Sequence, residues 1–189
     1  MTKEDQINLI NSTINKAREN LRPLSFNLIF WGVVINLMSA FHYFFEPIVE
    51  YSKYSVVLYW TSIPILGMVY MIRWNIKRGI EIGYETVLDR TIKIIWSVFG
   101  FGWFFIVISS LLIGKSPVPL ILFLLGLVLV MNGLIIKFKP LTIGGIILLI
   151  FVFINDTNPG INYLIVNMIG VSSGMLIPGL FLYRMKNSG

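Results

Sequence analysis

Residues 116–136, SPVPLILFLLGLVLVMNGLII, form an apolar stretch that contains no charged side chain. A hydrocarbon core about 30 Å thick is crossed by ~20 helical residues, because an α-helix rises ~1.5 Å per residue. The stretch has this length, and a lysine bounds it on each side, at Lys115 and Lys137. It therefore predicts a helix that crosses a lipid bilayer.

The rest of the chain has the same character. Its 189 residues are 56% hydrophobic and 13% charged, whereas a soluble domain carries roughly 25% charged residues. The charges are confined to short segments between long apolar windows, so lipid must solvate much of the surface. The windows are 26–45, 54–72, 94–114, 116–136, 141–154 and 163–183.

The fifth window, 141–154, is too short to be assigned by length alone. Even 140–155 gives only about 24 Å of helix. Such a helix either spans a locally thinned bilayer or enters and leaves on one side. Leaving it out would place Arg184 and Lys186 outside the cell, which counts against doing so.

The distribution of positive charge predicts the orientation. If all six windows span, one side of the membrane receives thirteen Lys and Arg residues and the other receives only Lys53 and Lys115. Cytoplasmic loops carry the excess of Lys and Arg, so both termini are expected in the cytoplasm, with 184–189 as a tail. The prediction is an all-α integral membrane protein with six transmembrane helices in three hairpins.

Residues 1–25 are expected to form a cytoplasmic amphipathic helix. Its apolar positions recur every three or four residues and lie on one stripe: Ile7, Ile10, Ile14, Ala17, Leu21 and Leu24. The segment lies as a helix on the membrane surface, pairs as a short helix with another copy or a cytoplasmic partner, or is disordered. We expect no cleaved signal peptide, because so long a segment precedes the first window.

The net charge of +6 is explained by this orientation and by attraction to anionic lipids of the inner leaflet, so we expect no nucleic-acid partner. Most charged residues outside the termini lie in the segment 73–93. Its acidic residues recur every four positions among Lys and Arg, and we expect this segment to prolong the third transmembrane helix.

No Asp, Glu, Lys or Arg lies within any of the six windows, and the chain has no cysteine. Proton-coupled and ion-coupled carriers usually keep a titratable group inside the membrane. The pattern Gly170-x-Ser172-x-Gly174 matches a hydrolase nucleophile motif, but that motif needs a strand-to-helix turn. Its potential base, His42, lies roughly 9 Å away in depth. We therefore expect no enzyme and no cofactor.

His42, Glu46 and Glu50 have the spacing of one helix face and could ligate a metal. Pro47 is expected to end or bend the helix, which breaks this register. We therefore expect a His–Glu pair at the surface and no metal site.

Two further sets of residues are candidates inside the membrane. Gly144, Gly145, Gly170 and Gly174 are expected to allow close helix packing. Three asparagines and two prolines form a potential polar pathway, because proline frees backbone carbonyls: Asn36, Asn132, Asn167, Pro64 and Pro178. The alternative for each of them is ordinary packing between helices.

Two segments, IIKFKPLTIGGI at 135–146 and LIPGLFLYR at 176–184, accompany Trp31-Gly32 in the first window. Together they resemble a family of small six-span inner-membrane proteins of Bacteroidetes-type bacteria. The resemblance implies six spans and a bacterial inner-membrane location, and it carries over no catalytic or binding residue.

Two functions remain from the sequence. The first is a non-enzymatic membrane protein that acts through helix packing with itself or a partner. The second is a channel or carrier for a small neutral solute.

Overall fold

The computed structural model describes residues 22–84, 86–113, 116–158 and 160–187. Every regular element in these residues is helical, which confirms the all-α prediction. The elements are α2 (Arg22–Phe44), α3 (Glu46–Val49), α4 (Lys53–Ile82), α5 (Val87–Ile113), α6 (Val118–Ile135), α7 (Lys139–Thr157), α8 (Tyr163–Val171), the π-helical turn η1 (Ser172–Leu176) and α9 (Ile177–Asn187). The last three follow without a break and form one rod, which we call the C-terminal rod.

In the part of the chain that the structure describes, five helices are long and apolar enough to cross a membrane. They are Pro23–Phe44, Tyr54–Glu81, Val87–Ile113, Val118–Ile135 and Tyr163–Arg184. These five helices support the predicted membrane character. The apolar part of α7, Lys139–Asn155, is shorter than the others, as the length of the window 141–154 predicts.

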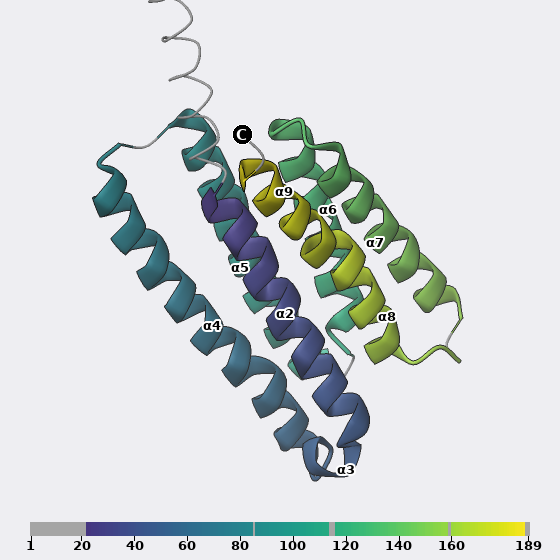
Figure 1. The fold of residues 1–189 in the computed structure, drawn as a ribbon. Coiled ribbons are helices and arrows are strands. Elements are labelled where there is room, and N and C mark those ends of the chain that lie inside the picture. Colours follow the sequence, from purple (N-terminus) through teal and green to yellow (C-terminus); the bar gives the residue numbers. More distant parts are fainter. Residues whose placement is uncertain (1–21, 85, 114–115, 159, 188–189) are drawn as a thin grey trace, which may run out of the picture.

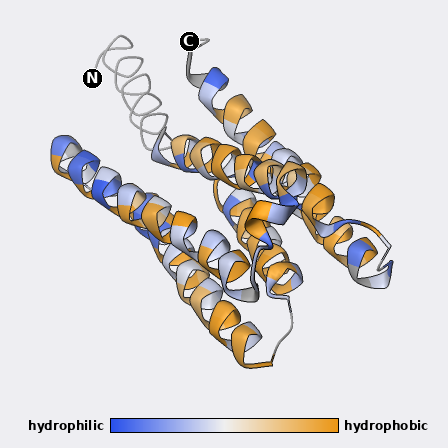
Figure 2. Ribbon diagram, turned by 90° about the horizontal axis from the view of Figure 1, so that it is seen from below, coloured by the Kyte–Doolittle hydropathy of each residue, from blue (hydrophilic) through white to orange (hydrophobic). Residues whose placement is uncertain are grey.

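Successive long helices run in alternating directions (Figure 1). The α4–α5 turn, the α6–α7 turn and the end of α9 lie at one end of the bundle, whereas α3 and the α7–α8 connection lie at the other. We call the first the basic end, because it carries Arg73, Lys77, Arg78, Arg90, Lys93, Lys137, Lys139 and Arg184. Figure 2 shows hydrophobic residues along the helices and hydrophilic ones gathered toward their ends.

The C-terminal rod lies at the centre of the helix packing. It contacts α2 on one side and α7 on the other, α7 packs along α6, and α6 packs along α5. The core between these helices is apolar and almost fully buried: Leu24, Leu28, Leu129, Leu141, Leu148, Val171 and Met175. Burial of these side chains fixes the rod against its neighbours through close packing.

Helix α4 lies at the edge of the bundle and packs along α2 through large aromatic side chains. Phe26 stacks on Trp74 with ring centroids 4.4 Å apart, and Phe30 stacks on Tyr70 at 5.4 Å. Gly67 faces the Trp31 ring: a Cβ there would lie 2.8 Å from the Trp31 Cη2 atom. The ring contacts thus fill a wide space between two helices whose backbones do not approach closely.

The helices extend beyond the apolar windows at the basic end. The prediction that 73–93 prolongs the third helix is wrong for its first half, because α4 continues to Ile82 and α5 begins only at Val87. Gly83, with φ 73°, ends α4 in a left-handed conformation that glycine adopts readily. Residues 1–21 of the predicted amphipathic helix, with Ile7, Ile10, Ile14 and Leu21, lie outside the described residues. Its predicted end at residue 25 is wrong, because α2 already begins at Arg22 and Leu24 belongs to the buried core.

Candidate functional site

The four glycines predicted to pack helices all lie at helix–helix contacts. A Cβ on Gly144 would lie 2.5 Å from the Ser173 carbonyl oxygen, and one on Gly145 would lie 2.8 Å from the Val130 nitrogen. A Cβ on Gly170 would lie 2.5 Å from Leu148 Cδ1, and one on Gly174 would lie 3.1 Å from Leu129 Cδ1. The adjacent Gly144 and Gly145 thus let α7 approach the C-terminal rod with one face and α6 with the other.

Two more glycines make a close contact that the packing prediction missed. A Cβ on Gly32 would lie 3.0 Å from Leu176 Cβ, and one on Gly179 would lie 2.9 Å from Leu28 Cβ. Both glycines lie where α2 crosses the C-terminal rod. Gly32 and Gly179 directly follow Trp31 and Pro178, which are named in the sequence analysis. The sequence alone does not show that these two glycines face each other's helices, so their contact was not predicted.

Polar residues of α2 and the C-terminal rod pair with each other. Asn167 donates through Nδ2 to the Ser39 hydroxyl at 2.8 Å, and Ser172 donates its hydroxyl to Asn36 Oδ1 at 3.0 Å. Asn36 also donates to the Gly32 carbonyl at 2.6 Å. We call Asn36, Ser39, Asn167 and Ser172 the polar seam. Ser172 is therefore bonded to Asn36 and not to His42.

Asn132 does not join the polar seam through any hydrogen bond. It is fully buried on α6 and donates through Nδ2 to the Val128 carbonyl of its own helix at 2.8 Å. Within the described part of the chain, Asn132 Oδ1 and Asn167 Oδ1 are buried without a hydrogen-bond partner. Two of the three predicted asparagines thus converge on one interface, and the third lies on another helix.

The two prolines occupy different settings. Helix α4 continues through Pro64 from Lys53 to Ile82. Pro178 is fully buried directly after the π-helical turn, and its Cγ would lie 3.2 Å from a Cβ on Gly144. Proline cannot donate to the carbonyl one turn earlier, so a widened turn at this point accommodates the missing hydrogen bond.

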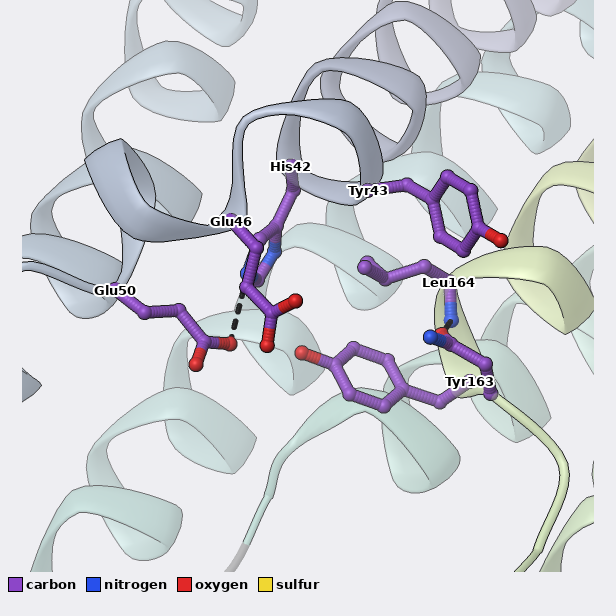
Figure 3. A pocket seen from close by; sticks show the side chains of 7 residues that line it. His42, Tyr43, Glu46, Glu50, Tyr163 and Leu164 are labelled. Carbon is purple, nitrogen blue, oxygen red and sulfur yellow. Dashed lines mark hydrogen bonds and ion pairs between the residues drawn. The ribbon is translucent and has the colours of Figure 1, made fainter.

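A polar pocket of about 370 Å³ opens at the end of the bundle opposite the basic end (Figure 3). Side chains from the end of α2, from α3 and its C-cap, and from the start of α8 line it: His42, Tyr43, Glu46, Glu50, Asn162, Tyr163 and Leu164. Asn162 begins α8 by accepting a hydrogen bond from the Leu164 backbone N–H at 2.9 Å. The pocket thus forms where two helix termini meet.

His42 is held on both ring nitrogens. Trp60 of α4 donates its indole N–H to His42 Nδ1 at 3.0 Å, and His42 Nε2 lies 3.0 Å from Glu50 Oε1. An indole N–H can only donate, so Nδ1 must accept. The remaining proton of the neutral ring is therefore on Nε2, which donates to the Glu50 carboxylate. This arrangement fixes one tautomer of His42.

The predicted His–Glu pair exists, but its location differs from the prediction. His42 is fully buried, and only Glu50 is partly exposed. Helix α2 ends at Phe44, before Pro47, and the short α3 turns the chain so that Glu50 returns to His42. Among the described residues, no group of three His, Cys, Asp or Glu side chains is placed to hold a metal ion. No sequence pattern indicated Trp60 as a partner of His42, because this contact joins two different helices.

No protein-family model, no curated protein and no solved structure matches the chain. The resemblance drawn from 135–146 and 176–184 therefore stays a prediction.

Proposed function

We propose that this protein is a non-enzymatic, multi-pass membrane protein that acts through helix packing with itself or with a partner protein. The observation that carries the proposal is Gly100 on α5. The other glycines within the apolar windows for which neighbours are given, such as Gly144 and Gly174, meet a neighbouring helix, whereas a Cβ on Gly100 would meet nothing within 4 Å. Small residues on helix surfaces allow another helix to approach closely in lipid.

The surroundings of Gly100 fit such a contact. Exposed apolar side chains follow the outer side of α5 with three- and four-residue spacing, and Gly100, which is half-buried, lies beside this row and not within it: Val98, Phe101, Phe105, Ile108 and Leu112. Only 17% of the apolar window of α5 is buried inside the bundle, compared with 50% of the window in the C-terminal rod. Helix α5 therefore has most of its surface available to lipid or to another helix.

The proposal includes six crossings of a bacterial inner membrane with both termini in the cytoplasm. The nineteen residues of α7 give roughly 28 Å of helix, close to the thickness of the hydrocarbon core. The basic end carries the Lys and Arg residues of the turns, which supports its place on the cytoplasmic side. The bacterial location is supported by the resemblance alone.

Crosslinking through Gly100 tests this function directly, because the chain contains no cysteine. A Gly100→Cys variant in native membranes is expected to form an oxidant-dependent disulfide dimer, or an adduct with a partner when a bifunctional maleimide is used. Ser62→Cys, on the exposed outer side of α4, is the matched control and is expected to remain monomeric. A monomer for both variants, together with solute transport by the purified protein, would contradict the proposal.

The alternative is a channel or carrier for a small neutral solute. It is favoured by the buried amide oxygens of Asn132 and Asn167, which lack a donor among the described residues. A polar solute could satisfy them, since an unpaired buried acceptor costs roughly 1–3 kcal/mol. Against it, Leu148 and Leu129 pack on the C-terminal rod at Gly170 and Gly174, and both leucines are fully buried. Osmotic swelling of proteoliposomes in glycerol or urea, with and without Asn167→Leu, separates the two functions.

A further inference from the structure

The pocket opposite the basic end carries an excess of hydrogen-bond acceptors. Two carboxylates, from Glu46 and Glu50, line it, and none of the lining residues that the structure describes is a Lys or Arg. The Glu46 carboxylate forms no hydrogen bond or ion pair with any residue that the structure describes, and only the Glu46 backbone carbonyl accepts, from the Glu50 N–H at 2.7 Å. The one histidine of the lining is neutral in the arrangement set by Trp60 and donates its only N–H to Glu50. The pocket is therefore negatively charged, and it contains carboxylate oxygens that accept no hydrogen bond from the described residues.

These acceptors converge on one space. Figure 3 shows the Glu46 and Glu50 carboxylates and the Tyr163 hydroxyl directed toward the same region of the pocket. His42 occupies Glu50 Oε1, which leaves Oε2 available. The Glu46 carboxylate of α3, the Glu50 carboxylate at its C-cap and the Tyr163 hydroxyl of α8 can thus accept hydrogen bonds from one ligand group.

We propose that this pocket binds the primary ammonium group of a small organic amine. A primary ammonium has three N–H donors and one positive charge, which match three acceptors and a negative pocket. A quaternary ammonium has the charge without the donors. A divalent metal is disfavoured, because His42 already uses both ring nitrogens and no three-ligand group exists among the described residues.

The walls of the pocket suit the carbon portion of such a ligand. Tyr43 and Leu164 line the pocket beside the carboxylates, and its volume of about 370 Å³ falls in the range of small-molecule sites. Asn167, one helical turn after Tyr163, has an unpaired and buried amide oxygen but does not line the pocket. The site does not depend on Gly100 or on self-association.

Titration of the full-length protein with n-butylammonium chloride tests the proposal. In lipid nanodiscs, isothermal calorimetry is expected to show saturable binding, and Glu46→Gln is expected to weaken it at least tenfold, because the variant removes a charge from the pocket. Glu81→Gln is the matched control, since Glu81 is an exposed carboxylate at the basic end, and it is expected to bind like the unaltered protein.

Three results would overturn the proposal. The first is the absence of saturable binding at millimolar n-butylammonium. The second is equal loss of affinity in Glu46→Gln and Glu81→Gln, which would indicate nonspecific charge attraction. The third is equal competition by tetramethylammonium or by calcium chloride, which would remove the requirement for three N–H donors. Competition by other primary amines alone supports it.

Discussion

Trp60 and His42 satisfy each other's polar atoms inside the bundle, 18 positions apart in the chain. Trp96 offers the opposite case, because its indole N–H is buried without a hydrogen-bond partner among the described residues. Both indoles are partly buried, so the two tryptophans differ mainly in this hydrogen bond. The pair therefore allows the hydrogen bond to be separated from the packing of the ring.

We expect Trp60→Phe to destabilise the protein more than Trp96→Phe. The first change leaves His42 Nδ1 buried without a donor, which costs roughly 1–3 kcal/mol, whereas the second removes a donor that had no partner. Unfolding of both variants by SDS in mixed micelles measures the difference. Equal losses of stability would show that the Trp60–His42 bond contributes nothing beyond packing.

Lys137 has an unusual backbone conformation, with φ 54°, after the end of α6. Its N–H donates to the Leu134 carbonyl, and the Phe138 N–H donates to the Gly133 carbonyl at 2.8 Å. This is the Schellman arrangement, in which glycine normally occupies the left-handed position. Lysine there carries a conformational cost that glycine would avoid.

Lys137→Gly is therefore expected to raise the free energy of unfolding by about 1 kcal/mol. Lys139→Gly removes the same charge from the start of α7, where the backbone is helical, and is expected to give no gain. Thermal unfolding in detergent compares the two. A loss of stability in Lys137→Gly would mean that the lysine side chain matters more than its backbone.

At the scale of elements, α7 depends on its paired glycines for contact on two faces. Gly144→Ala is expected to cost about 1–3 kcal/mol, because the added methyl meets the Ser173 backbone, which cannot move aside like a side chain. Gly79→Ala is the control, since a Cβ there meets nothing within 4 Å, and it is expected to be neutral or stabilising. SDS unfolding measures both. Equal effects would indicate that α7 does not pack closely on the C-terminal rod.

Some of these elements could be predicted from the sequence and others could not. The apolar windows place the helices because charge is excluded from lipid, and Gly144 and Gly145 stand out because small residues are needed where helices touch. The extension of α4 to Ile82 was missed, because charged residues mark the end of an apolar window and not the end of a helix. Polar residues within helices were identifiable, but their partners, such as Ser39 for Asn167, depend on packing.

The pocket likewise combines a feature that could be predicted from the sequence with others that depend on the packing of distant helices. The His42–Glu50 pair was predictable from spacing, whereas its burial was not, because burial depends on Trp60 from α4 and Tyr163 from α8. No local pattern reveals that the ends of α2 and α8 meet. The surplus of acceptors at this site therefore became visible only in the folded chain.

At the scale of the whole molecule, basic and acidic side chains are separated between the two ends of the bundle. Basic residues gather at the α4–α5 and α6–α7 turns and the end of α9. The acidic pocket lies at the other end. Such separation fits an even number of crossings, with the basic end in the cytoplasm.

Cysteine labelling of intact cells tests this topology most directly, because the chain has no cysteine of its own. Single variants Ser52→Cys, Gly160→Cys, Thr86→Cys and Asn187→Cys are treated with a membrane-impermeant maleimide. The account predicts labelling at positions 52 and 160 and protection at 86 and 187 until the membrane is permeabilised. Protection at 160 together with labelling at 187 in intact cells would show that α7 does not cross, and would contradict the six-span arrangement.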